Sequence, residues 1–119
     1  MPLLFSYGTL QDEQVQLSLF GRKLDGREDW LLGYEQSLAR VEDPEFARTS
    51  GKADHWILRP AVSDRARVAG TALEVTDAEL ERADKYEPVE YRRVLAMLAS
   101  GRETWVFVDA RVRSPAGEA

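Results

Sequence analysis

A glycine-led turn near the start of this 119-residue sequence is the first segment whose residue types suit chemistry. This segment, Tyr7-Gly8-Thr9-Leu10, begins at the last residue of the apolar run Leu3–Tyr7. Because glycine carries no side chain, successive backbone amides at such a turn can point toward a ligand, and a nest of N–H groups suits a carboxylate or phosphate. Thr9 adds a hydroxyl. A tight turn that binds nothing fits the same four residues, so both interpretations stay open.

Glu87 is the second candidate. Pro88 follows it and disfavours helical geometry in the preceding residue, so we expect Glu87 at the end of a helix. There the helix macrodipole is negative and gives the charged carboxylate no help. If the side chain points into a closed sheet, desolvation raises its pKa toward the range where a carboxylate both accepts and donates a proton near neutral pH. A solvated surface glutamate is the alternative, and position alone does not decide.

Composition removes several other kinds of chemistry. The sequence has no cysteine, which excludes disulfides, thiolate nucleophiles and thiolate metal sites. The one histidine, His55, argues against catalytic triads and multi-histidine metal centres. The acidic clusters Asp12–Glu13 and Glu42–Glu45 lack the alternating ligand spacing of a calcium loop. We therefore expect neither a metal nor a cofactor.

The charge balance and hydropathy restrict the partners. A net charge of -5 and a pI near 4.9 argue against nucleic acid, because neutralising phosphates needs clustered Lys and Arg. No apolar run is long enough to span a bilayer, and Met1–Phe5 lacks the basic start of a signal peptide. We expect a cytoplasmic protein with no membrane partner; its oligomeric state stays open.

The elements that must position the two candidates follow from local patterns. Leu3–Tyr7 is typical of a buried first strand, and Asp12–Phe20 has helical spacing with Gly21 as the stop. Trp30–Leu38 indicates one long strand that bends at Gly33. The polar stretch Glu42–Asp54 indicates a loop, and His55–Leu58 returns to strand composition.

The second half of the sequence has clearer signals. Val68–Val75 indicates a strand, with Gly70 where a backbone or ligand comes close. Thr76-Asp77-Ala78-Glu79 matches a capping box, which predicts a helix from there toward Tyr86. Tyr91–Ala99 and Glu103–Val108 flank the turn Ser100-Gly101 and predict a hairpin.

Six strands and two helices without regular alternation predict an α+β fold, in which a mixed or antiparallel sheet curls into a small barrel. We expect one domain over residues 1–112 and a flexible tail over 113–119, where Pro115 and Gly117 stand.

Two motifs together carry a family resemblance. The strand ending in Tyr7-Gly8-Thr9-Leu10, and the segment Leu80–Glu87 followed by Tyr91-Arg92-Arg93-Val94, resemble the two signatures of the γ-glutamyl cyclotransferase-like (AIG2-like) family. The resemblance covers Leu3 to about Phe107 and includes the Gly70 strand. It implies the family's fold and a γ-glutamyl amide as substrate.

The resemblance also implies residue roles. Tyr7, Gly8, Thr9 and Leu10 would bind the substrate carboxylate through backbone groups, with Glu87 as the catalytic acid and base. Tyr91 would hydrogen-bond the substrate, and Arg93 would form an ion pair with Glu87 or another acid.

The implied reaction is cyclisation of a γ-glutamyl amide to 5-oxoproline with release of an amine. We expect the stretch Glu42–Pro60 to contact the leaving group. The alternative is a non-catalytic protein that binds a small acidic metabolite on the same scaffold.

Overall fold

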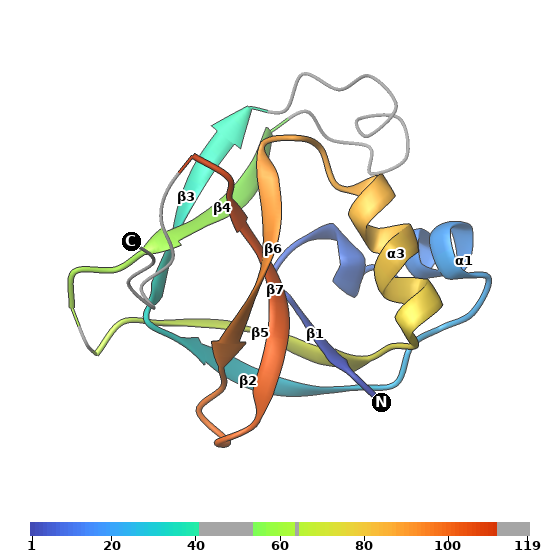
Figure 1. The fold of residues 1–119 in the computed structure, drawn as a ribbon, viewed down its shortest axis with the longest axis horizontal. Helices are drawn as coiled ribbons and strands as arrows, with labels where there is room; N and C mark the ends of the chain where they lie inside the picture. Colours follow the sequence, from blue (N-terminus) through green and yellow to red (C-terminus); the bar gives the residue numbers. More distant parts are fainter. Residues whose placement is uncertain (41–53, 64, 112–119) are drawn as a thin grey trace.

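The computed structural model describes residues 1–40, 54–63 and 65–111, which form two sheets and two α-helices (Figure 1). Five strands form a mixed sheet in the order β2-β5-β1-β7-β6, and β3 pairs with β4 in a second sheet. The elements are β1 (Leu3–Ser6), a 3-10 turn (Thr9–Gln11), α1 (Glu13–Phe20), β2 (Gly26–Leu32), β3 (Tyr34–Arg40), β4 (Asp54–Pro60), β5 (Arg67–Glu74), α3 (Asp77–Tyr86), β6 (Tyr91–Met97) and β7 (Glu103–Asp109).

Strand β1 lies at the centre of the large sheet and is buried along its whole length. It pairs antiparallel with β5 and parallel with β7. Its side chains alternate between two cores, as the period of a strand requires: Leu3 and Phe5 belong to one, and Leu4 to the other. Helices α1 and α3 cover the Leu4 side, and the β3–β4 sheet covers the Phe5 side (Figure 1).

Gly70 on β5 lets the central strands approach closely, as its position in the sequence indicates. A Cβ atom built there would lie 2.4 Å from the backbone oxygen of Ser6 and 2.6 Å from the ring of Phe5. No other residue fits at this position without a shift of the backbone, so Gly70 allows β5 to lie close to the carboxyl end of β1.

Both predicted helices form, α1 with its predicted stop at Gly21 and α3 with its predicted capping box, and Asp12 proves to be the N-cap of α1. The Asp12 side chain accepts a hydrogen bond from the Gln14 amide (2.8 Å), and Gly21 ends α1 in the left-handed conformation. The capping box is complete at α3, because Thr76 and Glu79 each accept from the other's amide. Helix α3 ends at Tyr86.

The expected long strand Trp30–Leu38 is wrong in one respect, since the chain divides at Gly33 into β2 and β3, which belong to different sheets. Gly33 has a φ of 84°, a left-handed conformation that breaks strand geometry instead of bending it. Strand β2 therefore pairs with β5, whereas β3 pairs with β4. The predicted loop Glu42–Asp54 lies almost wholly outside the described residues, and Asp54 begins β4.

The predicted hairpin forms between β6 and β7, with Gly101 at a φ of 89° in its turn. The expected curl of the sheet is also present, but the described strands do not close into a barrel. The edges β2 and β6 are joined by the isolated bridge Leu31–Leu98 and by the bond from the Ala99 amide to the Trp30 oxygen (2.8 Å), without a continuous ladder between the described strands. Strand β6 ends at Met97, just before this bridge.

No helix among the described residues is both long and apolar enough to cross a membrane. The predicted tail 113–119 lies outside the described residues, so the domain boundary at residue 112 stays a prediction.

Candidate active site

The loop after β1 passes through Gly8 into the 3-10 turn. The Gln11 amide donates to the Gly8 oxygen (3.1 Å), and the Asp12 amide donates to the Thr9 oxygen (2.9 Å). The amides of Thr9 and Leu10 stand at the start of the turn, where a helix offers no internal acceptor. Both residues line a pocket, which is where a ligand of these N–H groups would lie. Gly8 has a φ of -139°, and a Cβ built on it would meet nothing within 4 Å.

Two tyrosines fix this loop to distant parts of the chain. The Tyr7 hydroxyl donates to the backbone oxygen of Phe107 on β7 (2.5 Å), across 100 residues of sequence. The Thr9 hydroxyl bonds the Tyr86 hydroxyl at the end of α3 (3.1 Å). The loop is therefore held against both the sheet and the helix that ends beside Glu87.

Glu87 follows the last residue of α3 and directs its side chain into the same pocket. Its amide still donates to the Ala83 oxygen (3.0 Å), but its own φ of -71° and ψ of 134° are extended. This is the geometry that Pro88 requires of the residue before it. The expected helix end at Glu87 is therefore confirmed, together with its cause.

Burial raises the pKa of the Glu87 carboxyl to about 8, and desolvation is the cause. Within the described ranges, this carboxyl has no ion pair and no hydrogen bond with another residue. Arg93 binds Asp84 instead, through two hydrogen bonds of 2.7 and 2.9 Å, and stacks on Trp105 with its guanidinium 4.4 Å from the ring centroid. Of the two expected partners for Arg93, the structure therefore supports another acid.

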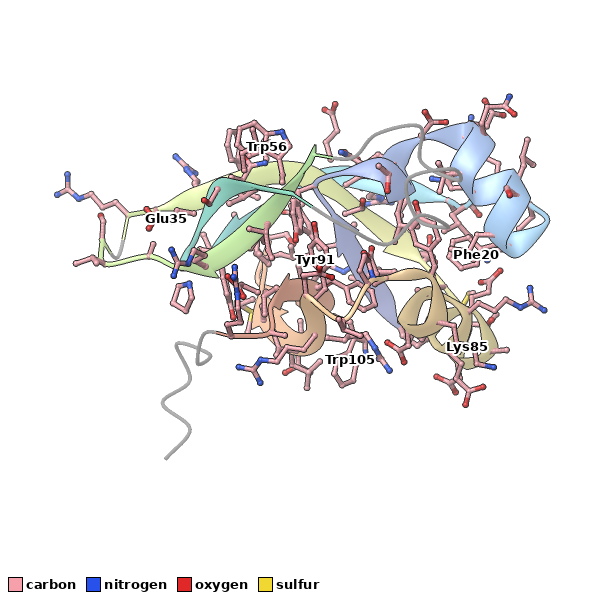
Figure 2. The ribbon with its side chains drawn as sticks, turned by 90° about the horizontal axis from the view of Figure 1, so that it is seen from above. Phe20, Glu35, Trp56, Lys85, Tyr91 and Trp105 are labelled. Carbon is pink, nitrogen blue, oxygen red and sulfur yellow. The ribbon has the colours of Figure 1, made fainter. Side chains whose placement is uncertain are left out.

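Tyr91 begins β6 and lines the pocket beside Glu87. Its hydroxyl donates to the backbone oxygen of Trp56 on β4 (2.9 Å) and so connects the two sheets. Figure 2 shows Tyr91 near the centre of the molecule, with Trp56 on the outer surface above it. Burial, and next the charge of Glu87, raise the pKa of the Tyr91 hydroxyl well above its usual value.

The six residues expected at the site all line this one pocket: Tyr7, Gly8, Thr9, Leu10, Glu87 and Tyr91. The structure adds Phe5, Ser6, Trp56 and Phe107 to the lining. No lysine or arginine is among these described lining residues, and nowhere in the described chain do three or more His, Cys, Asp or Glu side chains gather as metal ligands would.

Trp56 is the functional candidate that sequence reasoning passed over, because aromatic residues in strands are more often core. Its side chain is 49% exposed, so it is a wall of the pocket and not part of the core. The one available signal was its position within Glu42–Pro60, the stretch expected to contact the leaving group. Ser6 and Phe107 have no local signal, since strand pairing alone brings them here.

Three solved structures share the fold. Two are solution structures of Arabidopsis thaliana proteins. The first has a TM-score of 0.70 and 21% sequence identity, and the alignment covers 99% of this chain and 68% of that chain. The second has a TM-score of 0.68 and 22% identity, and the alignment covers 99% of this chain and 76% of that chain. The third is the crystal structure of an uncharacterised Pyrococcus horikoshii protein. Its TM-score is 0.61 at 21% sequence identity, and the alignment covers 99% of this chain and 84% of that chain.

The sequence itself assigns the family. No curated protein matches the chain. The family described as gamma-glutamyl cyclotransferase, AIG2-like, matches residues 4–118, nearly the whole length. The family's name indicates activity of the γ-glutamyl cyclotransferase type, and the pocket combines the loop and the glutamate from which the resemblance was first drawn. The chain therefore belongs to the γ-glutamyl cyclotransferase, AIG2-like family.

Proposed function

We propose that this protein is an enzyme that converts a γ-glutamyl amide, with an amino acid or amine as leaving group, to 5-oxoproline and the free amine. The observation that carries the proposal is the Glu87 carboxyl, which is half-buried and desolvated, without a partner among the described residues, in the same pocket as the loop Tyr7–Leu10. A desolvated carboxyl with no partner destabilises a fold, so its presence calls for a functional reason.

The substrate contains its own nucleophile. The α-amine of a γ-glutamyl group attacks the γ-carbonyl carbon, a five-membered ring closes, and the amide C–N bond then breaks. Positioning such an intramolecular attack can supply roughly 7–11 kcal/mol of the barrier. The enzyme's main task is to hold the chain folded.

In the proposal, Glu87 carries protons in both directions. The α-ammonium gives a proton to the Glu87 carboxylate, and the neutral amine attacks. When the tetrahedral intermediate collapses, protonated Glu87 gives that proton to the departing nitrogen, and the ring nitrogen gives its extra proton to the Glu87 carboxylate thus freed. Glu87 then passes this second proton to the released amine or to water, so that 5-oxoproline and the amine leave with all protons accounted for. A pKa of about 8 suits both moves near neutral pH, because a group close to the ambient pH accepts and donates with similar ease.

The loop Tyr7–Leu10 carries no charged side chain, which is compatible with the raised pKa of Glu87. In the proposal, the amides of Thr9 and Leu10 bind the α-carboxylate of the substrate. Because these N–H groups carry no full charge, they hold an anion without placing a cation beside Glu87, which would lower its pKa. When the substrate enters, its own ammonium becomes the cation that favours ionised Glu87.

The experiment is to incubate the purified protein with a panel of γ-glutamyl amino acids and γ-glutamyl amines and to measure 5-oxoproline. The wild type should release 5-oxoproline with an equal amount of amine, and Glu87→Gln should bind the same amide without turning it over. Glu81→Gln, an exposed glutamate on α3, controls for the replacement itself. If the panel raises the melting temperature but yields no 5-oxoproline, the protein is a binder and the proposal is wrong.

A further inference from the structure

The hydroxyls of Tyr7 and Tyr91 both donate their hydrogens to other parts of the protein. Each donates to a backbone carbonyl, Tyr7 to that of Phe107 (2.5 Å) and Tyr91 to that of Trp56 (2.9 Å). A carbonyl oxygen only accepts hydrogen bonds, so the direction of both bonds is certain. The backbone amide of Leu58 also hydrogen-bonds to the Tyr7 oxygen. What each phenol oxygen can still offer a ligand is therefore a remaining lone pair.

Both phenols share the pocket with the Glu87 carboxyl. All three residues line it. Burial is the largest cause of the raised pKa of each tyrosine; the charge of Glu87 comes next for Tyr91, and for Tyr7 it follows the interaction with Tyr91. The two hydroxyls therefore stay protonated and remain bound to their carbonyls. Neither hydrogen is free to stabilise the carboxylate, in agreement with the absence of a described hydrogen-bond partner for Glu87.

This side of the pocket thus presents acceptors and no cation. A ligand group that satisfies it must be a compact cation with several N–H donors. A primary ammonium has three such donors, which equals the number of acceptor groups present. Thr9 and Leu10, which line the same pocket, offer the opposite chemistry through their backbone amides.

We infer that Tyr7 and Tyr91 position the α-ammonium of the substrate by accepting hydrogen bonds from it, while its third N–H faces Glu87. This inference rests on the proposed function and gives a direction to the hydrogen bond expected between Tyr91 and the substrate. The two tyrosines are positioning residues, because the proton itself moves through Glu87. The arrangement selects a free primary α-amine and excludes an acylated one.

A matched pair of probes separates this role from a structural one. The first probe is γ-L-glutamyl-ethylamide, and the second is glutaric acid mono-ethylamide, which has the same carboxylate and the same amide but lacks the α-amine. Binding of both is measured by calorimetry in the Glu87→Gln protein, where no turnover interferes. Tyr7→Phe and Tyr91→Phe are then introduced one at a time into that protein.

Each tyrosine variant should weaken binding of the amine-bearing probe by about ten-fold, since a hydrogen bond to a charged group contributes about 1.5 kcal/mol. The same variants should change binding of the deamino probe by less than about two-fold. Each variant also leaves a carbonyl without its partner and lowers stability. The ratio of the two affinities, taken on one preparation, is independent of the folded fraction.

Tyr86→Phe is the matched control, because Tyr86 bonds the loop through Thr9 and is not among the described lining residues. It should affect both probes equally. Equal weakening of both probes by Tyr7→Phe and Tyr91→Phe, no weakening at all, or failure of the amine-bearing probe to bind would overturn the inference.

Turnover is scored separately. A protein that distinguishes the probes as expected but never releases 5-oxoproline supports the inference and refutes the proposed function. If the wild type releases 5-oxoproline but the tyrosine variants weaken binding of both probes equally or not at all, the proposed function is supported and the inference is refuted.

Discussion

Replacing Glu87 by glutamine should make the stability of this protein less dependent on pH. The native carboxyl keeps its proton up to about pH 8, whereas the unfolded one loses it near 4.5. Between these values the native state binds the extra proton, so the free energy of unfolding of the wild type falls as pH rises. The loss begins above the unfolded pKa and levels off above the native one. A glutamine at this position does not titrate.

The size of the effect follows from the two pKa values. A difference of one pKa unit corresponds to about 1.4 kcal/mol, so the shift from 4.5 to about 8 corresponds to a loss of as much as about 5 kcal/mol by pH 9. Domains of this kind are stable by only about 5–15 kcal/mol in total. The effect is therefore large enough to move an unfolding midpoint.

Urea unfolding of the wild type and Glu87→Gln at pH 5, 7 and 9 measures this difference. We expect the free energy of unfolding of Glu87→Gln, relative to that of the wild type, to increase from pH 5 to 7 and from pH 7 to 9, because every other titrating group is common to both proteins. Glu81→Gln, on an exposed position of the same helix, controls for the change of residue type. If the difference in free energy of unfolding between wild type and Glu87→Gln is the same at pH 5 and pH 9, the raised pKa of the Glu87 carboxyl is refuted.

Three further predictions concern other parts of the structure. Arg22→Met should lower the urea midpoint at pH 7, because two hydrogen bonds from Arg22 depress the pKa of Glu79 to about 2; the difference from wild type should shrink as the pH falls from about 4.5 toward 2. Gly70→Ala should cost about 3 kcal/mol or more by chemical denaturation, since its Cβ would overlap a backbone oxygen, whereas Gly8→Ala, with open space, should cost less than about 1 kcal/mol. Trp56→Ala should raise KM about ten-fold for γ-glutamyl amides with large apolar leaving groups and leave KM for the methylamide unchanged, which steady-state kinetics would show.

The parts of the fold that local chemistry controls could be predicted from the sequence. The start of α3 follows from the Thr76–Glu79 capping box, and its end follows from Pro88, so both bounds agree with the structure. The hairpin around Ser100-Gly101 agrees for the same reason. Each of these signals acts within a few residues of the place where it is read.

The fate of Gly33 could not be predicted, because a bend and a break have the same local sequence. Which one occurs depends on the partners of the two halves: β2 pairs with β5 and β3 pairs with β4, both far along the chain. The division at Gly33 is why the described residues contain seven strands where about six were expected.

The candidate site was predictable in its residues but not in its connections. The residues alone left Tyr7–Leu10 and Glu87 as two separate candidates, and the family resemblance joined them. The bond from Tyr7 to Phe107 spans 100 residues, and the bond from Tyr91 to Trp56 spans 35. Such contacts depend on the folded sheet, and so does the desolvation that raises the pKa of Glu87.

The most direct test of the central claim is a time course of 5-oxoproline formation from γ-glutamyl amides, followed by NMR with wild type and Glu87→Gln side by side. The account predicts that the wild type forms 5-oxoproline and free amine in equal amounts. It also predicts that Glu87→Gln, folded and still able to bind the amide, forms neither above the uncatalysed rate. Turnover by Glu87→Gln at the wild-type rate would contradict it.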